Sequence, residues 1–181
     1  KGSVIVRFGE PLDPFGLKVD EDGNSRDYRD RKVEPASYVS NLDGEVNEDP
    51  GRNTQYTREL GREIAASYQR HTVIMSTHLV ASACFEQLKE AAPSDDVFTI
   101  LRVREQTIER DALARSVLQL RDQLRKLEDA GQVVLADEVR SCSGSDIVSQ
   151  AIRAFDGYHT NPVIQPLDRG IALRDTRLLF Y

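Results

Sequence analysis

The stretch "ALARSVLQLRDQLRKLEDAG", residues 112–131, has the most regular apolar spacing in the chain. Five apolar residues, separated by four, three, four and three positions, share one helix face: Leu113, Val117, Leu120, Leu124 and Leu127. Gly131 follows, where a helix commonly ends on a glycine. The pattern predicts an amphipathic helix over residues 107–130. Two repeats of heptad spacing are too few to indicate a coiled coil.

Helices are also expected before this stretch. Asp49-Pro50 is typical of a helix start, and an apolar residue recurs every four positions from Tyr56 to Tyr68, which predicts a helix over residues 50–70. Residues 77–91, capped by Ser76 or Thr77, are apolar over a wide arc and are expected to be buried. A short helix is favoured over residues 97–101, capped by Asp95 or Asp96.

After the long helix the sequence predicts a small β element. Residues 133–135 form a brief apolar run, and a helix over about 145–156 ends at Gly157. Residues 163–173 indicate a hairpin with its turn at residues 168–170. Pro166 lies in the first strand and predicts that this strand is at the edge of its sheet, because proline has no N–H to donate. Asp175 is expected to cap a final helix. The predicted fold class is mainly α with minor β (α+β), and no internal repeat is evident.

The first fifty residues differ from the rest. Residues 4–8, "VIVRF", predict a strand that ends at Gly9-Glu10-Pro11, yet no partner strand follows for more than a hundred residues. Residues 17–49 are acidic, contain many turn residues and are expected to form a loop or a partly disordered insertion. The expected division is therefore residues 1–16, residues 17–49 and a helical region of residues 50–181. Because both ends look cut, we expect a fragment whose missing strands precede Lys1.

Composition narrows the function classes. The net charge is −6, and residues 1–50 hold twelve acidic against seven basic residues, so a nucleic-acid footprint is not expected. The chain has no apolar run of the length that spans a membrane. Cys84 and Cys142 lack the spacing of a metal site or redox motif. Two reduced thiols, with Cys84 buried on a helix, fit a reducing, intracellular compartment.

No active site is predicted. His71, His78 and His159 each fall at the end of a helix or in a turn, where a structural or solvated role is expected. The sequence contains no phosphate-binding glycine loop, no nucleophile elbow and no metal-ligand spacing. We therefore expect no catalytic residue, no cofactor and no metal in this chain.

Four ordered segments resemble bacterial glycerol-3-phosphate acyltransferases and the related 1-acyl-glycerol-3-phosphate acyltransferases. They are "VIVRFGEPLDPFG", "YTRELGREIAASYQRHTVIMSTHLVASACFEQL", "LRDQLRKLEDAGQVVLADEV" and "LRDTRLLFY". In that family a strand ending in FGEP follows the catalytic blocks. The resemblance implies that residues 4–8 complete the sheet of an upstream catalytic domain and that the rest packs behind it.

The family's chemistry uses a histidine with an aspartate five positions later. Five positions after His71, His78 and His159 stand Ser76, Ala83 and Ile164, so no catalytic residue carries over. Phe8, Gly9, Glu10 and Pro11 match the FGEP positions, where turning a strand end is the expected role.

The resemblance implies a non-catalytic part of a membrane-associated enzyme. Its full-length parent would transfer a fatty acyl group from acyl-CoA or acyl carrier protein to glycerol-3-phosphate or its 1-acyl derivative, in phospholipid biosynthesis. The expected location is cytoplasmic, peripheral to the inner face of the membrane. Contact with the bilayer would be interfacial, through residues 178–181 or residues 79–88, although burial in a core is the favoured fate of both.

The same predicted elements are also compatible with a different class of function. Helices over residues 77–91, 107–130 and 145–156 followed by the hairpin 163–173 could form a winged-helix-like module that binds protein or nucleic acid without enzymatic activity. Residues 76–181 are net acidic, which disfavours DNA and leaves protein docking.

Overall fold

The computed structural model describes residues 4–94, 96–100, 107–158, 162–168 and 170–174. Helices predominate and the sheets have only two or three short strands, so the chain is mainly α with minor β. It divides into two compact units, Val6–Thr72 and Val73–Tyr181, the second grouped with Lys1–Ile5. The helix over residues 50–70 falls within the first of these units.

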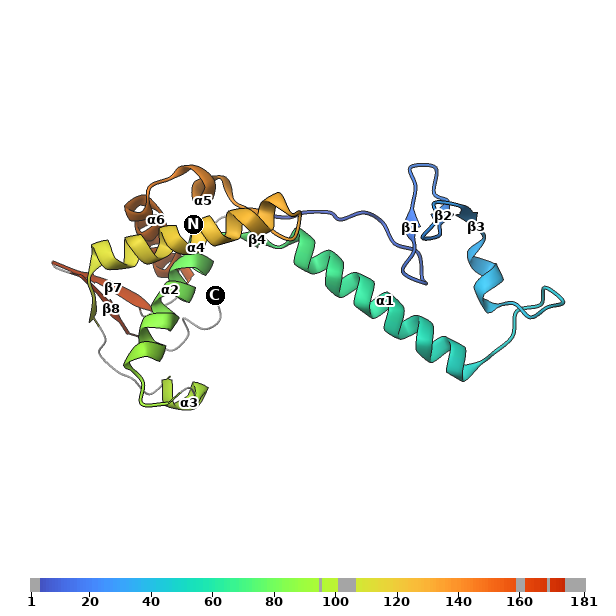
Figure 1. Cartoon of the computed structure of the whole chain (residues 1–181), viewed down its shortest axis with the longest axis horizontal. Coiled ribbons are helices and arrows are strands. Elements are labelled where there is room, and N and C mark those ends of the chain that lie inside the picture. Colours follow the sequence, from blue (N-terminus) through green and yellow to red (C-terminus); the bar gives the residue numbers. More distant parts are fainter. Residues whose placement is uncertain (1–3, 95, 101–106, 159–161, 169, 175–181) are drawn as a thin grey trace. The chain divides into compact units, whose positions relative to one another are not determined.

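Three helices build the second unit: α2 (Ser76–Ala91), α4 (Arg110–Asp129) and α6 (Gly144–Tyr158). Each packs against the other two (Figure 1). Their inward faces supply most of a continuous apolar core, in which Leu113, Val117 and Phe155 have no exposed surface. The arc over residues 79–88 is largely buried there, with Val80 and Cys84 inaccessible to solvent. The expected buried helix is confirmed, and this arc is not a lipid-facing surface.

A three-stranded antiparallel sheet completes this unit. The predicted hairpin is confirmed as β7 (Ile164–Leu167) and β8 (Gly170–Leu173), and β8 also pairs with β5 (Thr107–Ile108) on its other side. The strand order is therefore β5-β8-β7. Strand β7 forms an edge, as Pro166 predicts, because its only partner among the described residues is β8. The expectation that the long helix starts at residue 107 is wrong, since residues 107–108 are this strand.

A second, parallel pair of strands lies beside the helices. Strand β4 (Val73–Ile74) pairs with β6 (Val134–Leu135), which confirms the brief strand expected over residues 133–135. The Ala136 N–H extends the pairing by donating to the Ile74 carbonyl over 3.0 Å. Helix α5 (Asp137–Ser141) follows β6 directly, so both parallel strands lead into helices.

Local capping explains several helix boundaries. Gly131 has a φ of 69°, and its N–H donates to Glu128 O over 2.8 Å, which closes the last turn of α4 as predicted. Helix α3 (Val97–Ile100) is capped by Asp96, whose carboxylate accepts the Thr99 N–H over 2.9 Å. Ser76 does not cap α2 as expected, because the N-cap residue is Met75. Helix α6 extends one residue past the stop expected at Gly157.

The first unit contains one long helix, α1 (Pro50–His71), which confirms the helix expected over residues 50–70. Asp49 caps it, since its carboxylate accepts the Arg52 N–H over 3.0 Å. Tyr56 makes edge-on ring contacts with Phe15 and Tyr38, at centroid distances of 5.1 and 5.8 Å. These contacts hold the preceding residues against the helix.

The expected acidic loop over residues 17–49 contains regular local structure. Strands β1 (Lys18–Val19), β2 (Ser25–Arg26) and β3 (Lys32–Val33) form an antiparallel meander (Figure 1), and a 3-10 helix covers Pro35–Val39. Residues 4–8, expected to be a strand, belong to no helix or strand. Their pairing with an upstream sheet stays a prediction. The helix expected from Asp175 lies outside the described residues.

One turn recurs in this region at spacings of seven, seven and fourteen residues, which corrects the expectation of no internal repeat. Four turns share one geometry and begin at Asp13, Asp20, Asp27 and Asn41. In each turn the first side chain accepts the N–H groups two and four residues later, at 2.8–3.1 Å.

The fourth residue of each turn has a positive φ, and it is glycine in every copy except Asp30. This is the three-residue hairpin loop in which a type I turn is followed by a left-handed residue. The sequence signal is therefore an Asx residue, then glycine three positions later, recurring in multiples of seven.

Candidate functional site

The two described histidines, His71 and His78, have structural roles. His71 is the last residue of α1, and its Nδ1 lies 2.9 Å from the Ser67 carbonyl oxygen, an interaction in which the ring nitrogen donates. This position also suits a basic side chain at the negative end of the helix dipole. His71 therefore closes the helix, as expected from its place in the sequence. His159 lies outside the described residues.

His78 acts as a cap in the first turn of α2. Its Nδ1 accepts the Met75 N–H over 3.0 Å, so in this arrangement the neutral ring carries its proton on Nε2. The ring is partly buried, and this burial lowers the pKa of His78 below its usual value. A proton on Nδ1 would remove the acceptor. The neutral imidazole is thus part of how α2 begins.

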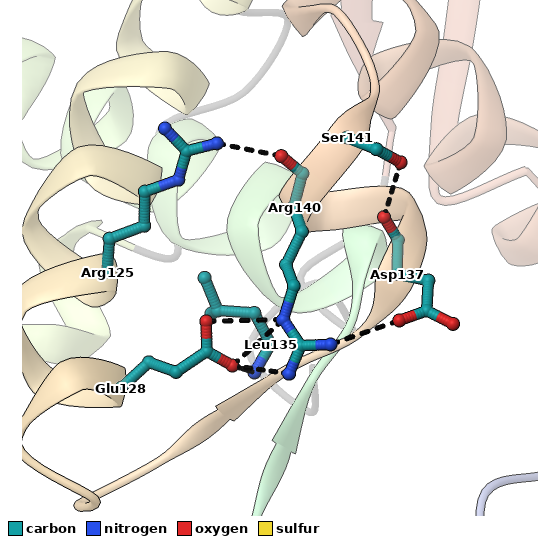
Figure 2. A network of polar contacts seen from close by, with 6 residues as sticks. All are labelled: Arg125, Glu128, Leu135, Asp137, Arg140 and Ser141. Atoms are coloured by element: carbon teal, nitrogen blue, oxygen red, sulfur yellow. Dashed lines mark hydrogen bonds and ion pairs between the residues drawn. The ribbon is translucent and has the colours of Figure 1, made fainter.

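A polar cluster, defined here as Arg125, Glu128, Asp137 and Arg140, joins α4 to β6 and α5 (Figure 2). The Arg140 guanidinium donates to Glu128 Oε1 over 2.6 Å and to Asp137 Oδ1 over 3.0 Å. Arg125 in turn donates to the Arg140 carbonyl oxygen over 2.7 Å. Figure 2 shows the Arg140 side chain lying between the two carboxylates.

Glu128 is the centre of this polar cluster. Its Oε1 also accepts the Leu135 N–H over 2.7 Å, which ties the end of α4 to strand β6. The hydrogen bond from Arg140 holds the pKa of Glu128 below its ordinary value, and the Leu135 N–H acts in the same direction. The carboxylate is therefore ionised and fully engaged near neutral pH. That is the chemistry of a structural anchor, since a general acid or base needs a pKa near the working pH.

Sequence reasoning missed the polar cluster because its members come from separate elements. One signal was available. Glu128 and Asp129 are acidic residues in the last turn of α4, where the helix dipole disfavours negative charge. Such a violation indicates that a side chain has a specific partner. Here that partner is Arg140, which neutralises Glu128.

The two free cysteines differ in burial. Cys84 is buried without exposed surface, and this burial raises the pKa of its thiol to about 12. The thiolate that nucleophilic or metal-binding chemistry needs is therefore absent near neutral pH. Cys142 is partly exposed, and its Sγ accepts from the Gln150 amide over 3.5 Å. Neither cysteine is in a disulfide.

Two other kinds of site are absent from the described part of the chain. Within residues 4–94, 96–100, 107–158, 162–168 and 170–174, no three His, Cys, Asp or Glu side chains gather as metal ligands would. Among the helices of these residues, none combines the length and apolarity needed to cross a membrane. Residues 178–181, one of the two stretches considered for bilayer contact, lie outside the described residues.

The charge of the exposed side chains of α6 bears on whether this helix could contact DNA. Its exposed side chains include Asp146, Arg153 and Asp156, so acidic groups outnumber basic ones. If α6 were the recognition helix of a helix-turn-helix protein, it would lie in the DNA major groove, close to the phosphates on either side. This composition is unfavourable for that contact. The hairpin β7–β8 adds an exposed Asp168 near its turn.

Comparisons with known proteins identified no relative. No family model, no curated protein and no solved structure matches the chain.

Proposed function

We propose that this chain is a non-catalytic region of a membrane-associated glycerolipid acyltransferase and that residues 73–174 dock onto another protein domain. The parent enzyme would transfer a fatty acyl group from acyl-CoA or acyl carrier protein to glycerol-3-phosphate or its 1-acyl derivative. The docking partner would be the upstream catalytic domain of the same protein. The expected setting is the cytoplasmic surface of the membrane, where the products are lipids.

The observation that carries this proposal is the ordered resemblance of four segments, from residues 4–16 to residues 173–181. The geometry adds support for the non-catalytic part. In His71 and His78, one ring nitrogen forms a hydrogen bond with a backbone group. The Glu128 carboxylate is kept ionised by its hydrogen bonds with Arg140. These three side chains are therefore engaged in structural contacts.

The direct test is acyl transfer by the full-length parent. Labelled acyl-CoA and acyl carrier protein would each be offered with glycerol-3-phosphate and with its 1-acyl derivative in turn. We expect transfer to one acceptor by the parent and none by residues 1–181 alone. Replacing the predicted histidine of an upstream His-x4-Asp sequence should abolish transfer. A parent that lacks this sequence and transfers no acyl group would refute the proposal.

A second candidate is favoured by the topology of the second unit. Its three long helices and its antiparallel sheet follow the order α2, β5, α4, α6, β7, β8, with β5 beside β8, and the shorter elements β4, α3, β6 and α5 lie between them in the sequence. This order of the longer elements supports a winged-helix-like module, the alternative considered from the sequence. On this reading the chain would contain a protein-binding module without enzymatic activity. The acidic surface of α6 argues for a protein partner over DNA.

Expression of residues 73–181 alone separates the two candidates. A self-contained module should fold cooperatively without the rest of the protein, because its apolar core is formed by its own residues. An integrated part of an enzyme should need upstream residues for full stability. Titration with duplex DNA at low salt should give no binding. Tight, salt-sensitive binding would instead indicate that the module binds nucleic acid.

A further inference from the structure

The unit Val6–Thr72 has no apolar core. All of the buried apolar side chains among the described residues lie at Leu79 or beyond, and the only buried side chains of this unit belong to Asp13 and Ser25. Even α1, with twenty-two residues, buries none of them. Folding this many residues costs conformational entropy that apolar burial normally offsets. The exposed surface of this unit is therefore a candidate for contact with another protein.

Helix α1 has one covered face and one open face. On the covered face, a Cβ added at Gly9 would lie 2.9 Å from Ser67 Oγ, and one added at Gly16 would lie 3.3 Å from the Leu60 Cα. Residues 9–16 thus run antiparallel along the helix. Tyr56 belongs to the same face through its ring contacts.

The open face of α1 is uncharged. Its residues are exposed and follow steps of three, four, three and four, which places them on one stripe: Thr54, Thr57, Gly61, Ile64 and Tyr68. Tyr68 is 74% exposed. Nothing lies within 4 Å of a Cβ added at Gly61, although glycine in the middle of a helix is costly. Arg58 and Arg62 border this stripe, and neither forms an ion pair with the described residues.

The segment before residue 9 has exposed apolar side chains and an unpaired backbone. Val4, Val6 and Phe8 are 84%, 69% and 91% exposed, and residues 4–10 belong to no strand. Valine, isoleucine and phenylalanine favour strands, and their free N–H and C=O groups can pair with a strand edge. The partner that suits this segment is therefore a β-sheet.

We propose that residues 6–8 and the open face of α1, which belong to the same unit, bind one β-sheet of a partner domain, the segment along its edge and the helix across its face. A strand followed by an antiparallel helix is the unit that packs in this way on an open sheet. The small residues around Gly61 would allow the helix to approach closely. Acidic groups at the border of the partner sheet would pair with Arg58 and Arg62. The identity of that sheet as the catalytic domain's rests on the proposed function.

Other occupants fit these observations less well. A second copy of the chain packed through α1 would leave the backbone of residues 6–8 unpaired. A bilayer would favour large apolar groups on the open face, and threonine and glycine supply little apolar area there. Only a sheet satisfies the helix face and the free backbone together.

The substitution Gly61→Leu tests the proposal because it should stabilise α1 in residues 1–181 alone and destabilise the complete protein. In residues 1–181 alone it should slow amide exchange in α1, because leucine is a better helix former than glycine. In the protein expressed from its complete reading frame, the added side chain should collide with the docked sheet and lower the melting temperature by several degrees. Gln69→Leu, on an exposed part of the same helix, is the matched control and should change neither protein appreciably.

Amide exchange of residues 6–8 gives a second measurement that does not depend on any variant. These amides should exchange at least about 100-fold more slowly in the complete protein than in residues 1–181 alone. Equal exchange rates in the two proteins would overturn the proposal. So would a dimer of residues 1–181 that Gly61→Leu dissociates, or protection of α1 only by vesicles of phosphatidylcholine and phosphatidylglycerol.

Acyl transfer measured on the same preparations separates this proposal from the proposed function. Protection of residues 6–8 in a protein without transfer activity would support the sheet contact and refute the enzyme. Transfer activity without protection of these residues would support the enzyme and refute the sheet contact.

Discussion

The two units of this chain are held by different kinds of interaction. Residues 73–174 bury a continuous set of apolar side chains from three helices and a small sheet. Residues 6–72 bury no apolar side chain and are instead organised by four copies of one turn and by contacts along α1. The difference shows that regular local hydrogen bonding can define a shape without supplying a core. We expect the first kind of unit to unfold cooperatively and the second to open locally.

The largest effect is expected from a cavity in the core of the second unit. Leu113 is fully buried in α4, so Leu113→Ala should lower the free energy of unfolding by about 2–5 kcal/mol. Leu127 lies in the same apolar stripe but is 40% exposed, which makes Leu127→Ala a matched control with a much smaller effect. Urea denaturation of residues 1–181 followed by circular dichroism would measure both. Equal losses for the two variants would show that the stripe is not buried as described.

A tight helix contact should give the next largest effect. A Cβ added at Gly144 would lie 2.6 Å from the Ala114 carbonyl oxygen, a backbone atom that cannot rotate away. Gly144→Ala should therefore destabilise the α4–α6 contact by about 1–3 kcal/mol. Gly157, near the other end of α6, has nothing within 4 Å, and Gly157→Ala should be neutral or stabilising. A neutral Gly144→Ala would mean that the two helices are further apart.

The polar cluster predicts a smaller, pH-dependent effect. Because the pKa of Glu128 is lowered in the folded state, its contribution is present above its ordinary value near 4.5 and is lost as the pH falls through the folded pKa. Glu128→Gln should cost about 1 kcal/mol at neutral pH. It should also remove part of the loss of stability in acid. Thermal melts of both proteins at several pH values between 3 and 7 would measure this.

Asp137→Asn is the control for this acid effect. Asp137 bonds to the same arginine, but its side chain is 97% exposed, whereas that of Glu128 is 22% exposed. Its replacement should change the acid dependence little, because exposed pairs are screened by solvent. An equal effect from both variants would argue that simple charge, rather than the bond to β6, explains the role of Glu128.

The sequence predicted local patterns well and long-range contacts poorly. The stripe from Leu113 to Leu127 indicated α4 because its period is carried by adjacent turns of one helix. Strand β5 was assigned to that helix, since a two-residue strand is defined only by its partner β8. The bond between Glu128 and Arg140 joins separate elements and has no local pattern. The wide apolar arc over residues 79–88 predicted burial correctly because it needed no knowledge of the partner.

The seven-residue repeat was present in the sequence and was overlooked for a physical reason. Its signal is carried by aspartate, asparagine and glycine, which are also the ordinary residues of irregular loops. Only the spacing separates a series of identical turns from a disordered segment. The copy that begins at Asp27 hides the pattern further, because Asp30 stands where the other copies have glycine.

This irregular copy provides the smallest and most specific prediction. Asp30 has a φ of 58°, a conformation that costs a residue with a side chain more than it costs glycine. Asp30→Gly should therefore stabilise its turn, by at most about 1 kcal/mol. Gly23, in the preceding copy, has a φ of 81°, and Gly23→Asp is the reciprocal change that should weaken its turn by a similar amount.

Amide exchange at the four turn positions would resolve these effects, because each copy closes its own hydrogen bonds. Slower exchange only around residues 27–31 in Asp30→Gly, and faster exchange only around residues 20–24 in Gly23→Asp, is the result expected of independent turns. A change that spreads through the whole meander would show that β1, β2 and β3 act as one cooperative sheet. In that case the contrast between the two units would lie in the size of their cores and not in their cooperativity.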